Sequence, residues 1–488
     1  MRYRENIRWK YLAIVRHIGT LLLGVALYLL LPLFVLIWYP SESNFLAPFC
    51  VAAAGAGACG LLFRLIGRKA GDVTLGLPEG GVIVLVGWIL AMVFSAVPFS
   101  LSGPLSFLHA LFESVSGWTT TGLSVVDVRE TPRILLLWRS LMQFAGGAGL
   151  VIIMLSAIVG PAGRSLSVAE GRSEQLLPNV RHSAKLVVRI YLGYAAAGIL
   201  LYLLAGMPLF DAINHSFCSL STGGFSTRTE SIGYYNSVSI ELVTMLLMLL
   251  GATNFIMHYA LLRGDLRSFF RNGEIRLTGA AIALFVPVLL GLALLPLYSA
   301  GRGVRVAFFE VISALTTTGY TSVSYSGWPD FGIMCLIVLM LIGGGIYSTA
   351  GGLKQYRIYL LFKSIIWEIS SNLMPASAVH DRYIWRGENK FYVGPEHIRE
   401  AGNYLFLYLS TYAAGVIIFL GYGYSLRESL FEFASALGTV GLSIGLTGPA
   451  MPPGILWTEI AGMFLGRLEF FVVIYSIIKI FRDAASAQ

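Results

Sequence analysis

The chain alternates long apolar stretches with shorter polar segments. A helix needs about 20 consecutive, mostly apolar residues to cross the hydrocarbon core of a bilayer. Ten stretches meet this requirement, and we predict that each forms a membrane-spanning helix. Their approximate ranges are 11–38, 45–66, 80–99, 134–159, 186–204, 238–262, 277–297, 331–362, 404–422 and 455–478.

Four shorter apolar segments lie between paired spans, at residues 106–118, 208–220, 305–315 and 427–437. Each would form only about three helical turns, which is too short to cross a bilayer. Each also leads into a polar loop that contains Thr and Gly. We therefore predict four re-entrant helices, each followed by a loop at membrane depth, where irregular backbone is tolerated only if protein or water surrounds it.

The four polar loops are related in sequence. Each has a glycine at the same point (Gly122, Gly224, Gly319 and Gly441), and the intervals between these glycines are 102, 95 and 122 residues. Such a recurring period indicates a repeated unit. Two upstream positions agree as well: Glu113, His215, Glu310 and Glu432 stand nine residues before the glycine, and Ser116, Cys218, Ser313 and Ser435 stand six before it.

The predicted fold is an all-α polytopic membrane protein. It has four pseudo-repeats of helix, re-entrant pore helix with filter loop, and helix around one central pore, and an extra N-terminal helix pair. The predicted boundaries are 1–79 for the N-terminal helix pair, 80–160, 161–263 and 264–362 for the first three repeats, 363–400 for a cytoplasmic connector and 401–488 for the fourth repeat.

Composition and charge agree with this interpretation. Hydrophobic residues make up 56% of the chain, charged residues 12%, and the mean hydropathy is +0.74, which excludes an ordinary soluble globule. Of the 34 Lys and Arg residues, 26 lie on one side of the predicted spans, so we expect both termini to be cytoplasmic. The net charge of +8 follows mainly from this asymmetry, and we do not expect binding to nucleic acid.

The four loops carry groups that suit a dehydrated alkali cation. Such an ion needs about six to eight oxygen ligands, and backbone carbonyls and Thr hydroxyls supply them without a full negative charge. Glycine admits the left-handed backbone that turns a carbonyl inward, and the C-terminal ends of re-entrant helices stabilise a cation at the midplane. The predicted selectivity filter comprises Thr120, Thr121, Gly122, Thr222, Gly223, Gly224, Thr317, Thr318, Gly319, Thr439, Val440 and Gly441.

Two features of the later spans depart from an uninterrupted apolar helix. Residues 343–352 contain five glycines, and because glycine costs roughly 1 kcal/mol per helical position relative to alanine, we expect the span to break there. Arg467 lies about midway along the last predicted span, where a lipid-facing guanidinium would cost at least about 2.5 kcal/mol. We therefore expect Arg467 to face the pore and to bind carbonyls and hydroxyls of residues 345–349. The alternative is a structural arginine that caps another helix away from the pore.

An enzyme is a poorer explanation of the sequence. The predicted spans hold no paired carboxylates, metal-ligand cluster or nucleophile and base pair. Residues 55–60 match GxGxxG by letter, but they lie inside an apolar span with no preceding strand, so we interpret them as small residues at a helix crossing.

Several motifs resemble the Trk/Ktr/HKT superfamily of potassium transporters, and the TrkH-type subunit in particular. Thr439-Val440-Gly441-Leu442 is similar to the potassium-channel filter without its second glycine. Residues 254–259, 343–352 and 464–469 resemble stretches of TrkH-type chains in the same order. The resemblance covers nearly the whole sequence.

This resemblance implies a potassium-uptake subunit in the bacterial inner membrane. K+ would be the transported ion, and the chain itself would bind no nucleotide. The family implies a homodimer and cytoplasmic TrkA-like regulatory subunits that bind NAD(H) and ATP. The implied gate comprises Gly343, Gly344, Gly345, Ser348, Thr349, Gly351, Gly352 and Arg467, and the implied K+ ligands are Thr121, Gly122, Gly223, Gly224, Thr318, Gly319, Val440 and Gly441.

The sequence departs from a uniform filter at Gly223 and Gly438, where the corresponding positions of other loops carry Thr. A sodium-permeable pore or an ion-coupled potassium symporter on the same scaffold therefore stays open as an alternative.

Overall fold

The computed structural model describes residues 2–70, 73, 75–103, 105–149, 180–375, 381–386 and 389–487. The chain divides into two compact units. Unit 1 comprises residues 1–119, 124–195 and 448–488, and unit 2 comprises residues 120–123 and 196–447. The second part of the predicted span 134–159 lies outside the described residues.

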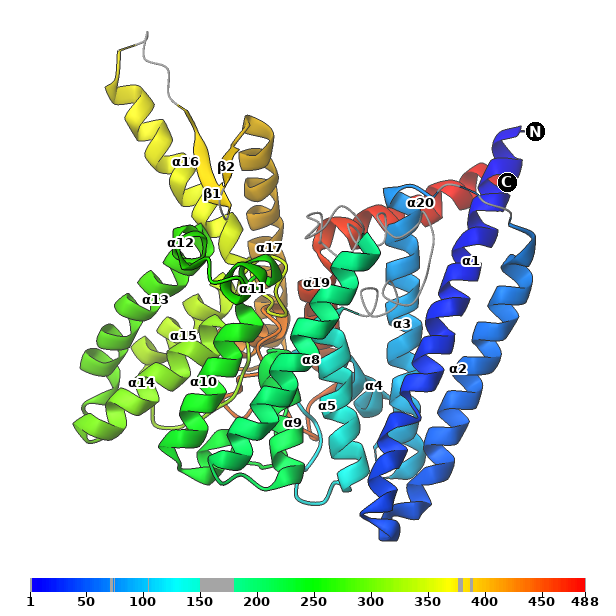
Figure 1. The fold of residues 1–488 in the computed structure, drawn as a ribbon, viewed down its shortest axis with the longest axis horizontal. Helices are drawn as coiled ribbons and strands as arrows, with labels where there is room; N and C mark the ends of the chain where they lie inside the picture. The colour runs from blue at the N-terminus through cyan, green and yellow to red at the C-terminus, as the bar shows by residue number, and fades with distance from the viewer. Residues whose placement is uncertain are drawn as a thin grey trace. The chain divides into compact units, whose positions relative to one another are not determined.

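Unit 1 is helical, and α1 (Arg2–Tyr28) runs beside α2 (Leu46–Ile66) (Figure 1). Small residues permit this close approach, because a β-carbon on Gly60 would lie 2.8 Å from the carbonyl oxygen of Gly19. The interpretation of residues 55–60 as a helix crossing is thus confirmed. The other elements are α3 (Leu77–Ser102), α4 (Phe107–Trp118), α5 (Arg133–Ala148), α8 (Val180–Leu204, which continues into unit 2), α19 (Pro453–Leu468), α20 (Phe470–Ala487) and 3-10 helices at Leu31–Ile37, Pro40–Phe45 and Gly67–Lys69.

Unit 2 contains the remaining helices and one small antiparallel hairpin. The hairpin pairs β1 (Tyr383–Arg386) with β2 (Asn389–Tyr392) and lies within the predicted connector 363–400. The helices are α9 (Leu209–Leu220), α10 (Val238–Ala252), α11 (Phe255–Leu262), α12 (Leu266–Arg271), α13 (Gly273–Leu289), α14 (Ala300–Leu315), α15 (Asp330–Ile342), α16 (Gln355–Leu373), α17 (Pro395–Gly421) and α18 (Leu426–Leu437), with a 3-10 helix at Ser231–Tyr235 and a π-helical turn at Leu290–Leu294.

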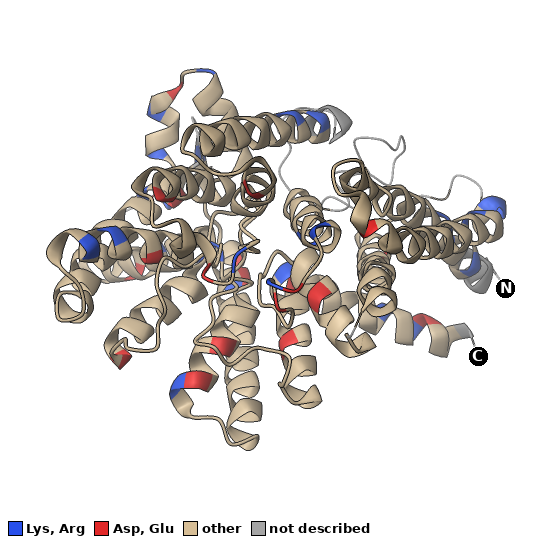
Figure 2. Cartoon of the chain, turned by 90° about the horizontal axis from the view of Figure 1, so that it is seen from below, with Lys and Arg blue, Asp and Glu red and all other residues tan. Residues whose placement is uncertain are grey.

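The helices have the apolar character that the sequence predicts. Long parts of them carry no Lys, Arg, Asp or Glu (Figure 2). Within the described residues, six helices are long and apolar enough to cross a membrane, and α10 with α11 counts as a seventh if a bent pair is one span. Three of the other predicted spans are shorter helices, namely α5, α15 and α19.

Two of the predicted continuous spans are broken. The predicted span 238–262 bends by 112° between α10 and α11, where Asn254 caps the new helix by accepting a hydrogen bond from the N–H of Ile256. The predicted span 455–478 is interrupted at Glu469, which has a left-handed backbone with φ of 65°. The break predicted within residues 343–352 is confirmed, because α15 ends at Ile342 and α16 begins only at Gln355.

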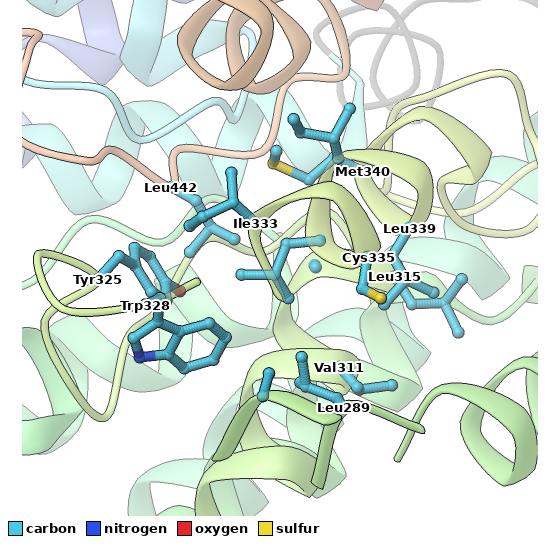
Figure 3. Close-up of a cluster of buried hydrophobic side chains, with 14 of the residues drawn as sticks. Leu289, Val311, Leu315, Tyr325, Trp328, Ile333, Cys335, Leu339, Met340 and Leu442 are labelled. Carbon is cyan, nitrogen blue, oxygen red and sulfur yellow. The ribbon is translucent and has the colours of Figure 1, made fainter. Parts of the chain in front are cut away.

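A large apolar cluster supports the loop that follows α18. Leu289, Val311, Leu339 and Met340 pack with Leu442, which comes directly after the glycine of the fourth polar loop (Figure 3). All five side chains are fully buried. Burial of this kind holds the base of the loop against α14 and α15.

Candidate functional site

The four short helices α4, α9, α14 and α18 each run into one of the four polar loops, as predicted. In every loop the threonine two residues before the glycine has a left-handed backbone, with φ of 54° at Thr120, 51° at Thr222, 54° at Thr317 and 51° at Thr439. A β-branched residue rarely adopts this conformation, which costs on the order of 1–3 kcal/mol. Strain of this size at four equivalent positions indicates a functional constraint on the backbone.

The glycines themselves also have positive φ. The values are 96° at Gly122, 73° at Gly224, 81° at Gly319 and 94° at Gly441. Thus each loop repeats one pattern in which a left-handed threonine and a left-handed glycine flank one residue of ordinary conformation. Glycine is the residue that tolerates this position without steric cost.

The flanked residue is tied to its own short helix. In the second, third and fourth loops its N–H donates to the carbonyl oxygen of the residue five positions earlier. The N to O distances are 2.8 Å for Gly223 to Cys218, 3.0 Å for Thr318 to Ser313 and 2.8 Å for Val440 to Ser435. The residues six before the glycine thus anchor the start of each of these three loops.

Successive loops touch one another in a closed ring. A β-carbon on Gly122 would overlap the carbonyl oxygen of Gly223, and one on Gly224 would overlap that of Thr318. In the same way Gly319 abuts the carbonyl of Val440, and Gly441 abuts the carbonyl of Thr121, which returns to the first loop. Each contact joins a glycine to the carbonyl of the next loop, so no side chain fits at any of the four points.

The ring gathers the predicted filter residues from four distant parts of the sequence. It brings backbone carbonyls and threonine hydroxyls together, and it brings no acidic side chain into the ring contacts. Such a set of neutral oxygens can replace part of the hydration shell of an alkali cation and still release it. It fits a cation that passes through and does not suit a tightly held structural metal.

The glycine-rich segment, residues 343–352, lies directly against this ring. The N–H of Gly351 donates to Oγ1 of Thr317 at 2.8 Å, and Oγ1 of Thr349 lies 3.1 Å from Oγ1 of Thr222. A β-carbon on Gly351 would overlap Oγ1 of Thr439. The segment therefore contacts the left-handed threonines of the second, third and fourth loops.

Other parts of unit 2 also bind the glycine-rich segment. Oγ1 of Thr349 lies 2.8 Å from the carbonyl oxygen of Gly251 and 3.1 Å from that of Leu220. The N–H of Gly345 donates to the carbonyl of Ala252 at 2.9 Å. Both Gly251 and Ala252 belong to the end of α10. The broken span 238–262 and the broken span 331–362 therefore hold each other.

The remaining predicted gate residues shape the segment itself. Gly343 and Gly352 both have positive φ and lie against one another, and Gly344 donates its N–H to the carbonyl of Gly351 at 3.3 Å. The hydroxyl of Ser348 donates to the carbonyl of Gly345 at 2.6 Å. These contacts fold the segment into a compact loop.

Arg467 has partners other than those expected. Arg467 is the last residue but one of α19. Its guanidinium donates to the carbonyls of Gly146 and Gly147 at the C-terminal end of α5, with a distance of 3.3 Å to Gly147. A cation at the C-terminal end of a helix complements the helix dipole. The expected partners, residues 345–349, belong to unit 2, whereas the hydrogen bonds described here lie within unit 1.

Sequence reasoning did not predict that Glu274 and Asn254 contribute to this site. The Glu274 carboxylate accepts from the N–H of Ile346 at 2.6 Å and from the side-chain amide of Asn254 at 3.4 Å. An asparagine within an apolar run is an N-cap signal and could have indicated the break between α10 and α11. Nothing near Glu274 in the sequence pointed to the glycine-rich segment, which follows it by about 70 residues.

The apolar helices and the ring of neutral oxygens fit the class of multi-pass membrane proteins that transport cations. The chain belongs to the TrkH family, described as cation transport proteins, because the family model matches residues 61–271 and 274–488. Membership confirms the resemblance drawn from the sequence and the expectation of a transporter in place of an enzyme.

Individual relatives agree with this membership. The chain is 32% identical over 489 residues to the Trk system potassium uptake protein TrkG of Escherichia coli K12, covering 95% of this chain and 97% of the relative. It is 33% identical over 412 residues to TrkH of the same strain, covering 81% and 84%. The crystal structure of the potassium transporter TrkH from Vibrio parahaemolyticus matches with a TM-score of 0.83 at 28% identity, covering 95% of this chain and 98% of that one.

Proposed function

We propose that this protein takes up potassium ions across the cell membrane and that the ring of four loops is its selectivity filter. The closed ring is the observation that carries the proposal, because it sets carbonyl oxygens from four loops around one point and leaves no room for side chains between them. The relatives named as potassium uptake proteins support K+ as the transported ion.

In this proposal the K+ ligands are the carbonyls and hydroxyls of the filter. The structure offers a physical test of fit, since a buried hydroxyl ordinarily has a hydrogen-bond partner. Among the described residues, no such partner is present for the buried hydroxyls of Thr120 and Thr439. Both occupy the left-handed position before the glycine, and a passing cation would give their oxygens a ligand role. The other K+ ligands in this proposal are Thr121, Gly122, Gly223, Gly224, Thr318, Gly319, Val440 and Gly441.

The glycine-rich segment is the proposed gate. It binds two of the four left-handed threonines by hydrogen bonds and abuts a third, so an ion that leaves the filter on this side would meet it. Arg467 would add to the gate through its fixed positive charge, and its described hydrogen bonds go to the end of α5. Release of the segment would then open the path.

The proposal includes assembly and orientation. The protein would be a homodimer in the bacterial inner membrane with both termini cytoplasmic, each protomer built of four repeats around its own pore. TrkA-like cytoplasmic subunits that bind NAD(H) and ATP would move the gate. The name of the relatives as parts of a Trk system supports separate partner subunits.

The test is ion uptake followed by electrophysiology. Expression in a bacterial strain that lacks its own potassium uptake should restore growth at low K+, and Rb+ should compete better than Na+. The purified protein in a planar bilayer under opposed K+ and Na+ gradients should then reverse near the Nernst potential of K+. A reversal near the Na+ potential would refute potassium selectivity, a reversal between the two potentials would indicate a pore that passes both ions, and a reversal outside that interval would indicate ion-coupled transport.

A further inference from the structure

One buried polar side chain in each of the four short helices reaches the segment that follows the filter. These side chains are the residues nine before the filter glycine, and we call them the braces: Glu113, His215, Glu310 and Glu432. All four are completely buried. A polar group at such a position is costly unless hydrogen bonds satisfy it.

The braces of the third and fourth helices accept several hydrogen bonds each. Glu310 accepts from the N–H and hydroxyl of Ser322 at 2.8 and 2.7 Å, and from the hydroxyl of Tyr325. Glu432 accepts from the hydroxyls of Ser443 and Thr447 at 2.7 and 3.0 Å. It also accepts from the N–H groups of Ile444 and Leu446 at 3.0 and 3.3 Å.

The first brace makes the same contact with added charge. Glu113 accepts from the hydroxyl of Ser124 at 3.0 Å and from the N–H of Val125 at 3.2 Å. Its carboxylate also pairs with the buried guanidinium of Arg139 at 2.6 Å. A charged acceptor strengthens each of these bonds relative to a neutral one.

The second brace is a histidine with an equivalent role. Nδ1 of His215 lies 2.8 Å from the carbonyl oxygen of Asp211, and Nε2 lies 3.0 Å from the hydroxyl oxygen of Ser226. Because a carbonyl only accepts, Nδ1 carries the proton in the neutral ring and Nε2 accepts from Ser226. All four braces are thus acceptors for a residue two or three positions after the filter glycine.

These contacts fix each filter loop at its far end. In the second, third and fourth loops, the near end is already held by the hydrogen bond from the residue before the glycine to its own helix. The glycine, and the carbonyl that meets the glycine of the preceding loop, lie between the two attachments. The separation of the ring's oxygens therefore depends on both attachments, and the smaller Na+ would be bound well only if the ring could contract.

We propose that Glu113, His215, Glu310 and Glu432 are positioning residues that determine the preference of the filter for potassium over sodium. The inference rests on the proposed potassium uptake. Loosening a brace lets one loop move inward, so its oxygens can follow a smaller ion. No brace is required to touch the ion.

Glu432 gives the sharpest test, because its partners are neutral N–H and hydroxyl groups and its helix contains a matched control. Glu432→Gln keeps the shape but turns one acceptor oxygen into a donor that faces other donors. Glu428→Gln makes the same change in α18, where the native carboxylate accepts from the N–H and hydroxyl of Ser425 at the helix start, at 2.9 and 2.8 Å. The two variants differ in whether the lost bonds hold the filter loop.

The measurement is the K+ to Na+ permeability ratio of the purified protein in a bilayer. We expect Glu432→Gln to lower the ratio by about fivefold to tenfold, which is the effect of losing about one ordinary net hydrogen bond, and Glu428→Gln to keep the wild-type ratio. Ser443→Ala removes one of the four partners of Glu432 and should lower the ratio as well, with no further loss in the double variant. A folded Glu432→Gln protein with the wild-type ratio would overturn the proposal.

The same experiment separates this inference from the proposed function. Failure of the wild-type protein to carry K+ would refute potassium uptake itself. Selective wild-type flux with unchanged selectivity in Glu432→Gln and Ser443→Ala would refute only the braces. If Glu432→Gln fails to fold, Ser443→Ala decides alone, because loss of one hydroxyl on the loop leaves the helix intact.

Discussion

Thr349 is the residue through which the glycine-rich segment can be released from the filter with the smallest change. Its hydroxyl lies within hydrogen-bond distance of the carbonyls of Gly251 and Leu220 and of the hydroxyl of Thr222. Its single proton can be donated to one of these acceptors at a time, and its oxygen can accept from the hydroxyl of Thr222. Thr349→Val keeps the branched shape and removes both.

The structure sets the size of the expected effect. Each buried hydrogen bond contributes about 1 kcal/mol, so the closed position should lose about 1–2 kcal/mol. If the closed position dominates in the protein alone, its open fraction should rise roughly fivefold to thirtyfold. The assay is K+ flux into proteoliposomes that contain the purified protein without regulatory subunits.

A matched variant controls for the chemistry of the substitution. Thr411→Val in α17 removes a hydroxyl that donates to the carbonyl of Leu407 within its own helix, at 2.9 Å. We expect this variant to keep the wild-type flux. Equal flux in Thr349→Val, Thr411→Val and wild type, with all three folded, would show that the bonds of Thr349 do not hold a gate.

Three further outcomes follow. Gly441→Ala drives a β-carbon into the next loop and should lower the K+ to Na+ permeability ratio by about tenfold. Gly445 has an equal φ of 94° but open space around it, so Gly445→Ala should keep the wild-type ratio. Equal ratios in the two variants would contradict the filter assignment. Neutral replacement of Arg467 by Gln should raise K+ flux without regulatory subunits while Arg467→Lys stays near wild type, and folded neutral variants with lower or unchanged flux would exclude the gate role. Gly60→Ala should destabilise the crossing of α1 and α2 by about 1–3 kcal/mol and lower the melting temperature in detergent. Gly57→Ala should keep the wild-type melting temperature, because its β-carbon would lie 3.7 Å from that of Ala26. Equal melting temperatures in the two variants would refute the tight crossing.

The four polar loops and their positive-φ glycines were predictable because their signal is local and repeated. A glycine that must have positive φ is visible as a glycine, and four of them at similar intervals exclude chance better than one. The positions nine residues upstream were visible too, but only as a pattern. That Glu432 accepts from residues beyond the filter depends on side-chain contacts that periodicity does not encode.

The breaks in the spans were harder to predict. Hydropathy is averaged over many residues, so single polar residues such as Asn254 and Glu469 did not reveal the breaks in their apolar spans. The glycine-rich segment was the exception, because five glycines in ten residues outweigh the average. The partners of Arg467 are about 320 residues earlier in the chain, and no spacing rule connects positions so distant.

The ring has a consequence that depends on its being made by one chain. A ring of four identical chains would carry any substitution four times and any gate four times. Here each loop is encoded separately, so Gly223 and Val440 can stand where the other two loops have threonine, and one glycine-rich segment can approach the ring from one side. If the ring is the filter that we propose, a single substitution would alter a quarter of it at a time, which allows finer steps in tuning conduction than a symmetric assembly has.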